Sequence, residues 1–439
     1  MFKTLVGAFK NKDIRKKILY TLMILVIVRV GSLLPIPGVD TEYFSSLLSG
    51  INTGDLSYLS AFTGGSFERM SLFALSITPY ITSSIIMQLL TIAIPKLEEM
   101  QKEGEDGRKK IASITRYVTI GLSLIESIAM AVGFGRSGLI KNSAQLSTLH
   151  YVVCIIVVVA ALTAGSAVLM WLGEGITEKG VGNGISIVLL INIISGMPSD
   201  FATLYSTFVA PKTPAKGVLA AVIILAILIV MVVLVCFLQD GERRIPVQYS
   251  QKVSGRRTVG GQSTNIPLKV NTAGVMPIIF ASSLMQFPVI IAQLFGKSYE
   301  WTRYLSSSYW CRVEAPKYSI GLLVYIVLLI IFAYFYTSIT FNPIEVADNL
   351  KKAGGVIPGI TPGKSTSEYL NKILNYIVFI GAVGLLIIAL IPIMCTGFFN
   401  ASVSFGGTSI IIIVGVVLET LKQIESQMCN RYYKGFLSE

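Results

Sequence analysis

Long runs of apolar residues recur along the chain, separated by shorter polar segments. The clearest run, Val218 to Leu238, holds 21 residues without a charge. A helix of that length crosses a hydrocarbon layer about 30 Å thick. The other runs lie at 18–36, 70–94, 112–134, 149–172, 273–295, 318–340 and 373–397, with two shorter ones at 183–197 and 406–427. Together they predict ten transmembrane helices.

Composition agrees with a membrane protein. Of the 439 residues, 53% are hydrophobic and only 14% are charged, whereas a soluble domain carries about 25% charged residues. A soluble enzyme is therefore excluded, and we expect an all-α polytopic fold. One His and five scattered Cys do not supply the ligand clusters of a metal centre. We expect no metal, no cofactor and no catalytic residues.

The positive charges are distributed unevenly between the connecting segments. If ten helices alternate, the segments on the side of the termini hold 26 of the 36 Lys and Arg residues, and the opposite segments hold nine. The remaining one, Arg29, lies inside the first apolar run. Because basic segments resist translocation, this bias predicts that both termini are cytoplasmic. Residues 1–17 would form a cytoplasmic amphipathic segment, although a solvated tail is an equal alternative.

Three features depart from a plain helical bundle. Residues 55–67 are partly apolar but too short to span, so they form either a re-entrant segment that lines a cavity or an ordinary surface loop. The second apolar run carries many polar groups and Pro79, which predicts a kink and a face turned away from lipid. The seventh run in chain order, 273–295, is similar. The two runs are therefore predicted to be corresponding parts of an internal repeat of five helices each.

The third feature is a pair of long connections at 239–271 and 341–372. The first carries Arg243-Arg244 and Arg256-Arg257 with only two acidic residues. Paired arginines on a projecting loop suit RNA phosphate or an acidic protein surface. The simpler interpretation is the ordinary basic character of a cytoplasmic loop.

From these observations two other classes of protein remain open. An inverted-repeat secondary transporter of small solutes would keep acidic residues near the middle of the membrane, and Glu126 is the main acidic residue within a run. A purely structural assembly scaffold would lack any pore.

Several longer motifs decide between these classes by resemblance. Residues 78–90 (TPYITSSIIMQLL) and 171–186 (WLGEGITEKGVGNGIS) resemble two signatures of the SecY family, the central subunits of the bacterial protein-conducting channel. Shorter matches follow in the family's order, at 33–40, 262–271, 342–352 and 405–409. The chain is identified by this resemblance as a member of that family.

The resemblance implies a clamshell of two pseudo-symmetric, inverted five-helix halves around an hourglass pore. The halves would be 18–202 and 218–427, joined by an external hinge at 203–217 and followed by a cytoplasmic tail at 428–439.

The resemblance also assigns four groups of residues. The pore ring would be Ile77, Ile81, Ile185, Leu189, Ile279 and Ile412. The plug, at about 55–67, would include Leu56, Tyr58, Leu59, Ala61, Phe62, Gly64 and Gly65. The lateral gate between the second and seventh helices would include Thr78, Thr82, Ser83, Gln88, Ser282, Ser283 and Gln286. The docking surface would include Arg243, Arg244, Arg256, Arg257, Lys351 and Lys352.

The resemblance further implies a place in the bacterial plasma membrane and a set of partners. These are the SecE and SecG subunits, the motor ATPase SecA, the ribosome, signal sequences and nascent chains, and the surrounding lipid. Two positions depart from the family pattern. Thr361 stands where most relatives carry an arginine that is tied to motor-dependent export, and Ser76 stands where a glycine is usual.

We predict that Arg256→Glu combined with Arg257→Glu abolishes docking of the ribosome and SecA while the channel still assembles. Reversing two charges replaces attraction to phosphate or acidic surface by repulsion. Co-sedimentation with ribosomes and binding of SecA check this, and undiminished affinity in the double variant would contradict it.

Overall fold

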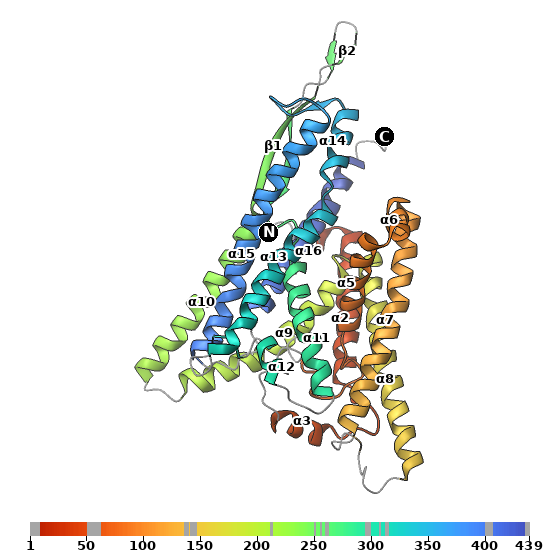
Figure 1. The fold of residues 1–439 in the computed structure, drawn as a ribbon, viewed down its shortest axis with the longest axis vertical. Coiled ribbons are helices and arrows are strands. Elements are labelled where there is room, and N and C mark those ends of the chain that lie inside the picture. The colour runs from red at the N-terminus through yellow and green to blue at the C-terminus, as the bar shows by residue number, and fades with distance from the viewer. Residues whose placement is uncertain are drawn as a thin grey trace.

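The computed structural model describes residues 9–50, 63–135, 140, 147–210, 214–249, 252–254, 257–259, 263–294, 300–306, 309–311, 316–399 and 407–434. A helix occupies each of the ten predicted spans (Figure 1). They are α2 (Lys12–Leu33), α5 (Thr78–Ala93), α7 (Glu105–Phe134), α8 (Thr148–Lys179), α9 (Gly184–Leu204), α10 (Pro214–Asp240), α11 (Met276–Leu294), α13 (Ile320–Thr340), α15 (Lys364–Phe399) and α16 (Gly407–Lys434). The all-α membrane fold is therefore confirmed.

Six helical segments in the described part of the chain are long and apolar enough to cross a membrane unaided. They begin at Glu105, Thr148, Gly184, Gly217, Pro316 and Lys364. The short run at 183–197 is among them, because its helix continues to Val209. A seventh span arises if α5 is joined to α6 (Pro95–Lys102), which it meets at an angle of 105°.

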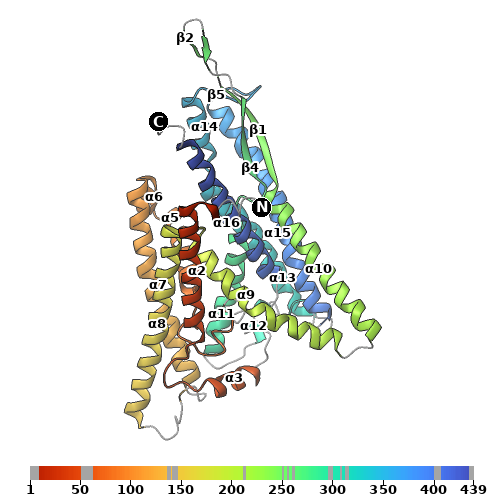
Figure 2. The same ribbon diagram turned by 180° about the vertical axis from the view of Figure 1, so that it is seen from behind.

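The packing divides the ten helices into two groups. In the first group α8 contacts α2, α7 and α9, and α5 packs on α7. In the second, α13 contacts α11 and α15, and α16 contacts α10 and α15. The groups meet where α9 packs on α16 and α7 packs on α11. Figure 2 shows α9 leading from the first group toward α10 of the second. These groups coincide with the five-helix halves expected from the sequence.

The two long connections form one lobe beyond the helix ends. Strand β1 (Glu242–Tyr249) pairs antiparallel with β4 (Ser263–Lys269) from Glu242 to Gln248 and with β5 (Gly355–Val356) at its end. The hairpin tip holds β2 (Lys252–Ser254) and β3 (Arg257–Val259). Alternate residues Ile245 and Val247 of β1 are buried, as a sheet with one covered face requires. They share an apolar cluster with residues of α14 (Pro343–Lys352) and the start of α15. We call this unit the strand lobe.

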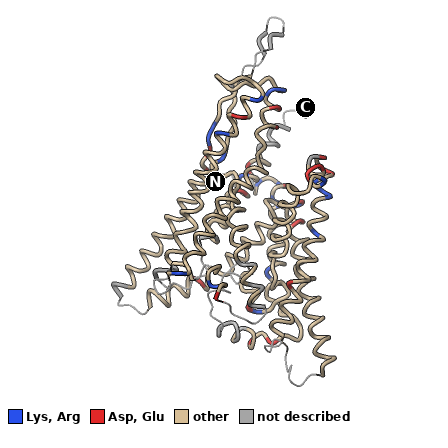
Figure 3. Tube along the Cα trace, viewed as in Figure 1, with Lys and Arg blue, Asp and Glu red and all other residues tan. Residues whose placement is uncertain are grey.

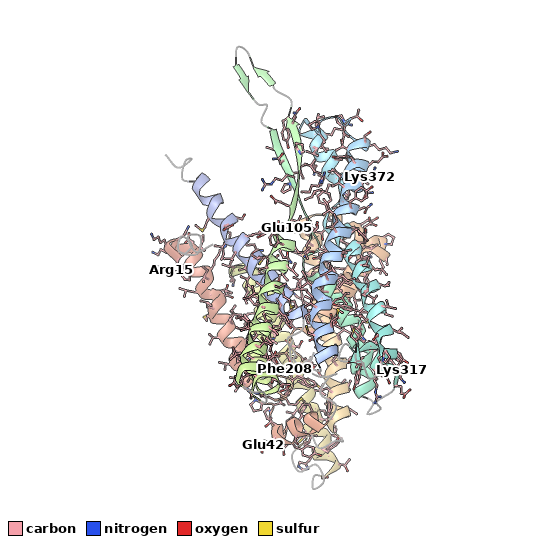
Figure 4. All side chains as sticks on the ribbon, turned by 90° about the vertical axis from the view of Figure 1, so that its left-hand side faces the viewer. Arg15, Glu42, Glu105, Phe208, Lys317 and Lys372 are labelled. Atoms are coloured by element: carbon pink, nitrogen blue, oxygen red, sulfur yellow. The ribbon has the colours of Figure 1, made fainter. Side chains whose placement is uncertain are left out.

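Short elements cover the opposite end of the molecule. Helix α3 (Thr41–Gly50) places Phe44 edge-to-face against Phe67 and Phe134. Between α11 and α13 the described residues hold α12 (Glu300–Leu305) and the 3₁₀ turn η4 (Pro316–Ser319). Figure 4 places Glu42 and Lys317 toward this end and Lys372 toward the strand lobe.

The expected kink at Pro79 is wrong. Helix α5 begins at Thr78, and Pro79 stands in its first turn, where a missing N–H costs nothing because that group has no helical partner. Most of the apolar run before it forms successive turns from Gly64 to Ile77 instead of helix. Leu34 and Ile36 pair through their backbones with Leu72 and Met70 of this segment.

Ser76 sits in these turns with a backbone that favours glycine. Its φ is +52°, a left-handed conformation that costs an L-residue roughly 1–2 kcal/mol. Its hydroxyl, 1% exposed, accepts a hydrogen bond of 3.0 Å from Nδ2 of Asn192 on α9. The serine that departs from the family pattern therefore gains a buried bond between the two segments.

We predict that Ser76→Ala is less stable than both Ser76 and Ser76→Gly. Both variants lose the hydrogen bond, which is worth roughly 1 kcal/mol, but only glycine relieves the backbone. The unfolding midpoint of the detergent-solubilised protein measures the order. Equal stability of the glycine and alanine variants would contradict it.

Candidate functional site

A large apolar cluster fills the centre of the molecule, between the two groups of helices. Four of the expected pore residues are buried within it, and two are partly buried and packed against it. The buried four are Ile77, Leu189, Ile279 and Ile412, and the partly buried two are Ile81 and Ile185. They come from the start of α5, from α9, from α11 and from α16, so the structure brings all six into one cluster.

Capping at two helix starts positions four of these side chains. Ile77 precedes α5, and its carbonyl accepts the N–H of Ile81 at 3.1 Å. Asn183 caps α9, its side chain accepting the N–H of Ile185 at 3.2 Å. In each helix the second residue follows the first by four positions, and such residues share one helical face. Ile77 with Ile81, and Ile185 with Leu189, therefore form two short aliphatic stripes.

A cavity of about 370 Å³ reaches this centre. Its lining includes Leu189, Ile279 and Ile412. The remaining lining is largely polar and belongs to segments near the strand lobe, among them Gln239, Lys269, Asn271, Glu419 and Lys422. The cavity thus has a polar wall on the lobe side and ends on three aliphatic side chains of the centre.

An ion pair beside this cavity connects α16 to α10. Nζ of Lys422 on α16 lies 2.7 Å from Oδ1 of Asp240 at the end of α10. Both side chains are about half exposed, so this ion pair contributes about 1 kcal/mol at most. Its position keeps the cavity bordered by charge.

Only the C-terminal part of the expected plug lies within the described residues. Leu56, Tyr58, Leu59, Ala61 and Phe62 lie outside them. Gly64 and Gly65 have positive φ angles of +62° and +77°. A Cβ at Gly64 would stand 2.7 Å from the carbonyl oxygen of Asn192, so the chain approaches α9 too closely there for any other residue.

Arg29 ties this glycine to the first helix. Its Nη1 donates to the carbonyl of Gly64 at 3.3 Å. The Ser195 hydroxyl of α9 donates to the carbonyl of Asn192 at 2.7 Å and lies 3.5 Å from the same Gly64 oxygen. The one basic residue within the first apolar run therefore has a defined partner. We call Arg29, Gly64 and Ser195 the plug anchor.

The expected gate residues fall into different environments. Ser83 is fully buried and its hydroxyl is hydrogen-bonded to Thr119 of α7. This places Ser83 within the packing of the first half, so its assignment to the gate is not supported by its position. The Thr82 hydroxyl donates to the carbonyl of Thr78 at 3.1 Å, within α5.

Two other expected gate residues, Gln88 and Ser282, have buried polar groups of their own. Oε1 of Gln88 is buried without a hydrogen-bond partner among the described residues. Ser282 of α11 is 7% exposed and lies against the Tyr325 hydroxyl of α13, whereas Ser283 is half-buried. The side chain of Gln286 lies outside the described residues.

The expected docking residues lie on the strand lobe. Arg243 and Arg244 are exposed on β1, and Lys351 and Lys352 are exposed at the end of α14. Figure 3 shows basic residues along this lobe. Arg256 and the side chain of Arg257 lie outside the described residues. The two long connections therefore present their described basic residues on one unit.

Sequence reasoning missed Asn192, which bonds Ser76 and borders Gly64. It lies 2% exposed in the middle of the short run at 183–197. The signal was available, because an amide within an apolar span requires a polar partner. It could not identify that partner, which lies 116 positions earlier in the chain.

These features define a class: a multi-pass helical membrane protein whose two halves enclose a polar-walled cavity that ends on aliphatic side chains. The SecY family model matches residues 71–421. The protein translocase subunit SecY of Streptomyces galbus is 44% identical, with both chains covered completely. That of Halalkalibacterium halodurans is 43% identical, again over 100% of each chain. The chain belongs to the SecY family.

Solved structures agree on the fold. A protein-conducting channel matches with a TM-score of 0.64 at 17% identity, over 94% of this chain and 92% of the other. A structure of the SecY protein that addresses its plug domain matches with a TM-score of 0.62, and the channel of a canine ribosome–channel complex with 0.61, each with the same coverage and at 17% and 16% identity. The family resemblance is confirmed, and a small-solute transporter is not favoured. Membership in a family of translocase subunits also confirms that the chain is not an enzyme.

We predict that Arg29→Met loosens the segment at 63–67. A hydrogen bond from a charged donor contributes about 1.5–3 kcal/mol, so amide hydrogen exchange in this segment should accelerate at least about tenfold. Ser195→Ala is the matched control, because it removes only the longer contact to the same carbonyl and should have a smaller effect. Unchanged exchange in the Arg29 variant would show that the plug anchor does not hold the segment.

Proposed function

We propose that this chain is the pore-forming subunit of a protein translocase, which conducts unfolded secretory polypeptides across the bacterial plasma membrane. The observation that carries the proposal is the cavity that ends on Leu189, Ile279 and Ile412, between two separately packed halves. A polypeptide would enter this cavity from the side of the strand lobe and pass through the aliphatic centre. Relatives that are translocase subunits over their full length support this function.

The aliphatic centre suits a pore that must close to ions and open for a polypeptide. Branched aliphatic side chains cannot replace the hydration shell of an ion, so a constriction made of them closes by dewetting. They form no directional bonds, so they contact a passing chain of any sequence. In this proposal the six residues at the centre form the pore ring.

Residues 55–67 would form the plug that closes the pore on the side opposite the strand lobe. The plug anchor supports this role, since it fixes the C-terminal end of the segment to both α2 and α9. A related structure concerns a plug domain that stabilises the closed state of its channel.

The lateral gate would lie between α5 and α11, on the side where α11 meets the first half. Helix α11 packs on α7 of the first half and on α13 of the second, so opening this gate would also separate α11 from α7. An apolar segment inside the pore would gain roughly 0.3–0.6 kcal/mol for each Leu, Ile, Phe or Val that enters lipid. The buried, unpaired amide oxygen of Gln88 and the side chains of Thr78, Thr82, Ser282, Ser283 and Gln286 would set how readily this seam opens.

The strand lobe would dock the partners that deliver polypeptides. Its exposed basic residues suit ribosomal RNA phosphate and the surface of SecA. A fold relative comes from a ribosome–channel complex. Thr361 precedes α15, and its hydroxyl lies 2.9 Å from that of Ser365 in the first turn of the helix. A threonine cannot supply the cation that most relatives carry there. This puts the usual SecA contact at that position in doubt.

SecE would hold the two halves together from outside the pore, and SecG would complete the complex. The excess of Lys and Arg on one side supports cytoplasmic termini. Energy for transport would come from translation, from SecA or from the membrane potential.

Photo-crosslinking tests the path of the polypeptide. We predict that probes at the six ring positions crosslink to a stalled secretory precursor. Probes at Ile194, Leu284 and Val417, which lie on the same helices α9, α11 and α16 but are 39–51% exposed on the outside, should give little product. Equal crosslinking from both sets, or none from the ring, would contradict the proposal.

A further inference from the structure

Asn192 stands where the aliphatic centre meets the turns that precede α5. It lies on α9, three positions after Leu189, and its side chain is 2% exposed. Its Nδ2 donates to the hydroxyl of Ser76 at 3.0 Å, and Ser76 directly precedes Ile77. One buried amide is therefore joined, through short stretches of chain, to two residues of the aliphatic centre that come from different segments.

The backbone that carries this amide is fixed on several sides. The carbonyl of Asn192 accepts a hydrogen bond of 2.7 Å from the Ser195 hydroxyl. The same carbonyl oxygen lies so close to Gly64 that a Cβ at that glycine would stand 2.7 Å from it. Helix α9 also packs on α8 in its own half and on α16 in the other. The amide of Asn192 therefore projects toward Ser76 from a rigid base.

Ile77 lies at a junction between two segments that are themselves held. Before the junction, the ring of Phe73 packs closely against α2. After it, the buried hydroxyl of Ser83 bonds to α7. Between them the chain turns at Ser76, whose φ is +52°, and α5 begins two positions later. The direction of the Ile77 side chain therefore depends on the backbone conformation at Ser76.

Serine needs support in this left-handed conformation. The conformation crowds Cβ against the following carbonyl, whereas glycine adopts it without strain. The bond from Asn192 opposes the relaxation of Ser76 to a negative φ. Packing alone does not account for the asparagine, because its Oδ1 is buried without a hydrogen-bond partner among the described residues. An unpaired polar atom destabilises the folded state, and an aliphatic side chain would fill the same space without that cost.

We propose that Asn192 is a positioning residue of the pore, which holds the turn at Ser76 and thereby keeps Ile77 in the aliphatic centre. The inference rests on the proposed channel function, because it concerns how that channel is closed at rest. Without the bond, Ser76 relaxes, Ile77 turns away from the centre, and the constriction no longer excludes ions by dewetting. Asn192 acts through Ile77 and does not contact the polypeptide.

The resting ion conductance of the purified translocase complex in planar lipid bilayers tests this. Asn192→Ala should raise the conductance about fivefold, because the net contribution of one hydrogen bond corresponds to a factor of about five between the two conformations of the turn. Ser76→Ala breaks the same bond from the other side and should raise the conductance by a similar factor. Ser76→Gly in the Asn192→Ala background should restore the low conductance, since glycine adopts the left-handed turn without strain.

Thr163→Val is the matched control. It removes the hydrogen bond of 3.0 Å between the Ser127 and Thr163 hydroxyls, which joins α7 to α8 in the same half. The residue before it, Leu162, belongs to an apolar cluster separate from the centre. The unfolding midpoint of this variant should fall about as far as that of Asn192→Ala, whereas its resting conductance should equal that of the unaltered chain.

Three results would overturn the proposal. Unchanged conductance in Asn192→Ala and Ser76→Ala would show that the bond does not hold Ile77. A raised conductance that Ser76→Gly fails to restore would show that Asn192 acts by a route other than the turn. A raised conductance in Thr163→Val would show that the loss of any buried bond opens the constriction. Failure of the channel function itself is recognised separately, because the unaltered chain would then give no crosslinks from the ring to a stalled precursor.

Discussion

The contact between the two groups of helices is the constraint on which the rest of the structure depends. It consists at the centre of aliphatic side chains from four separate segments, packed without directional bonds. Dispersion and burial stabilise such a contact in proportion to its area. Away from the centre, Nζ of Lys17 on α2 donates to Oε1 of Gln427 on α16 at 3.3 Å and so links the two halves directly. Other polar pairs, such as Ser83 with Thr119 and Asn192 with Ser76, lie within one half. Each half thereby stays intact while the seam between them remains adaptable.

Hydrogen bonds, an ion pair and a close backbone contact lie on the two sides of this aliphatic centre. On the side opposite the strand lobe, Arg29 holds the carbonyl of Gly64, where only glycine fits against α9. On the lobe side, capping of α9 and the ion pair between Lys422 and Asp240 border the central cavity. The aliphatic centre is therefore framed by backbone and polar contacts, whereas its own side chains meet through apolar packing.

The strand lobe likewise combines backbone pairing with an apolar cluster. Its sheet is closed by β5, which comes about a hundred residues after β1 and follows α14. The apolar cluster beneath it joins residues from both long connections. The lobe therefore connects α14 and the start of α15 with the strands that follow α10.

The sequence alone determined the class of protein and the number of spans, because an apolar run of about 20 residues has only one stable arrangement in a lipid layer. Motif resemblance added the family and the six central residues, which all fall in one cluster. The tertiary structure decided what depends on contacts between distant segments. The run at 70–94 begins as turns because its backbone pairs with residues 34–36. Ser83 packs inward because Thr119 faces it. Local periodicity cannot predict such partners, since a residue's own neighbours carry no information about which remote segment will lie against it.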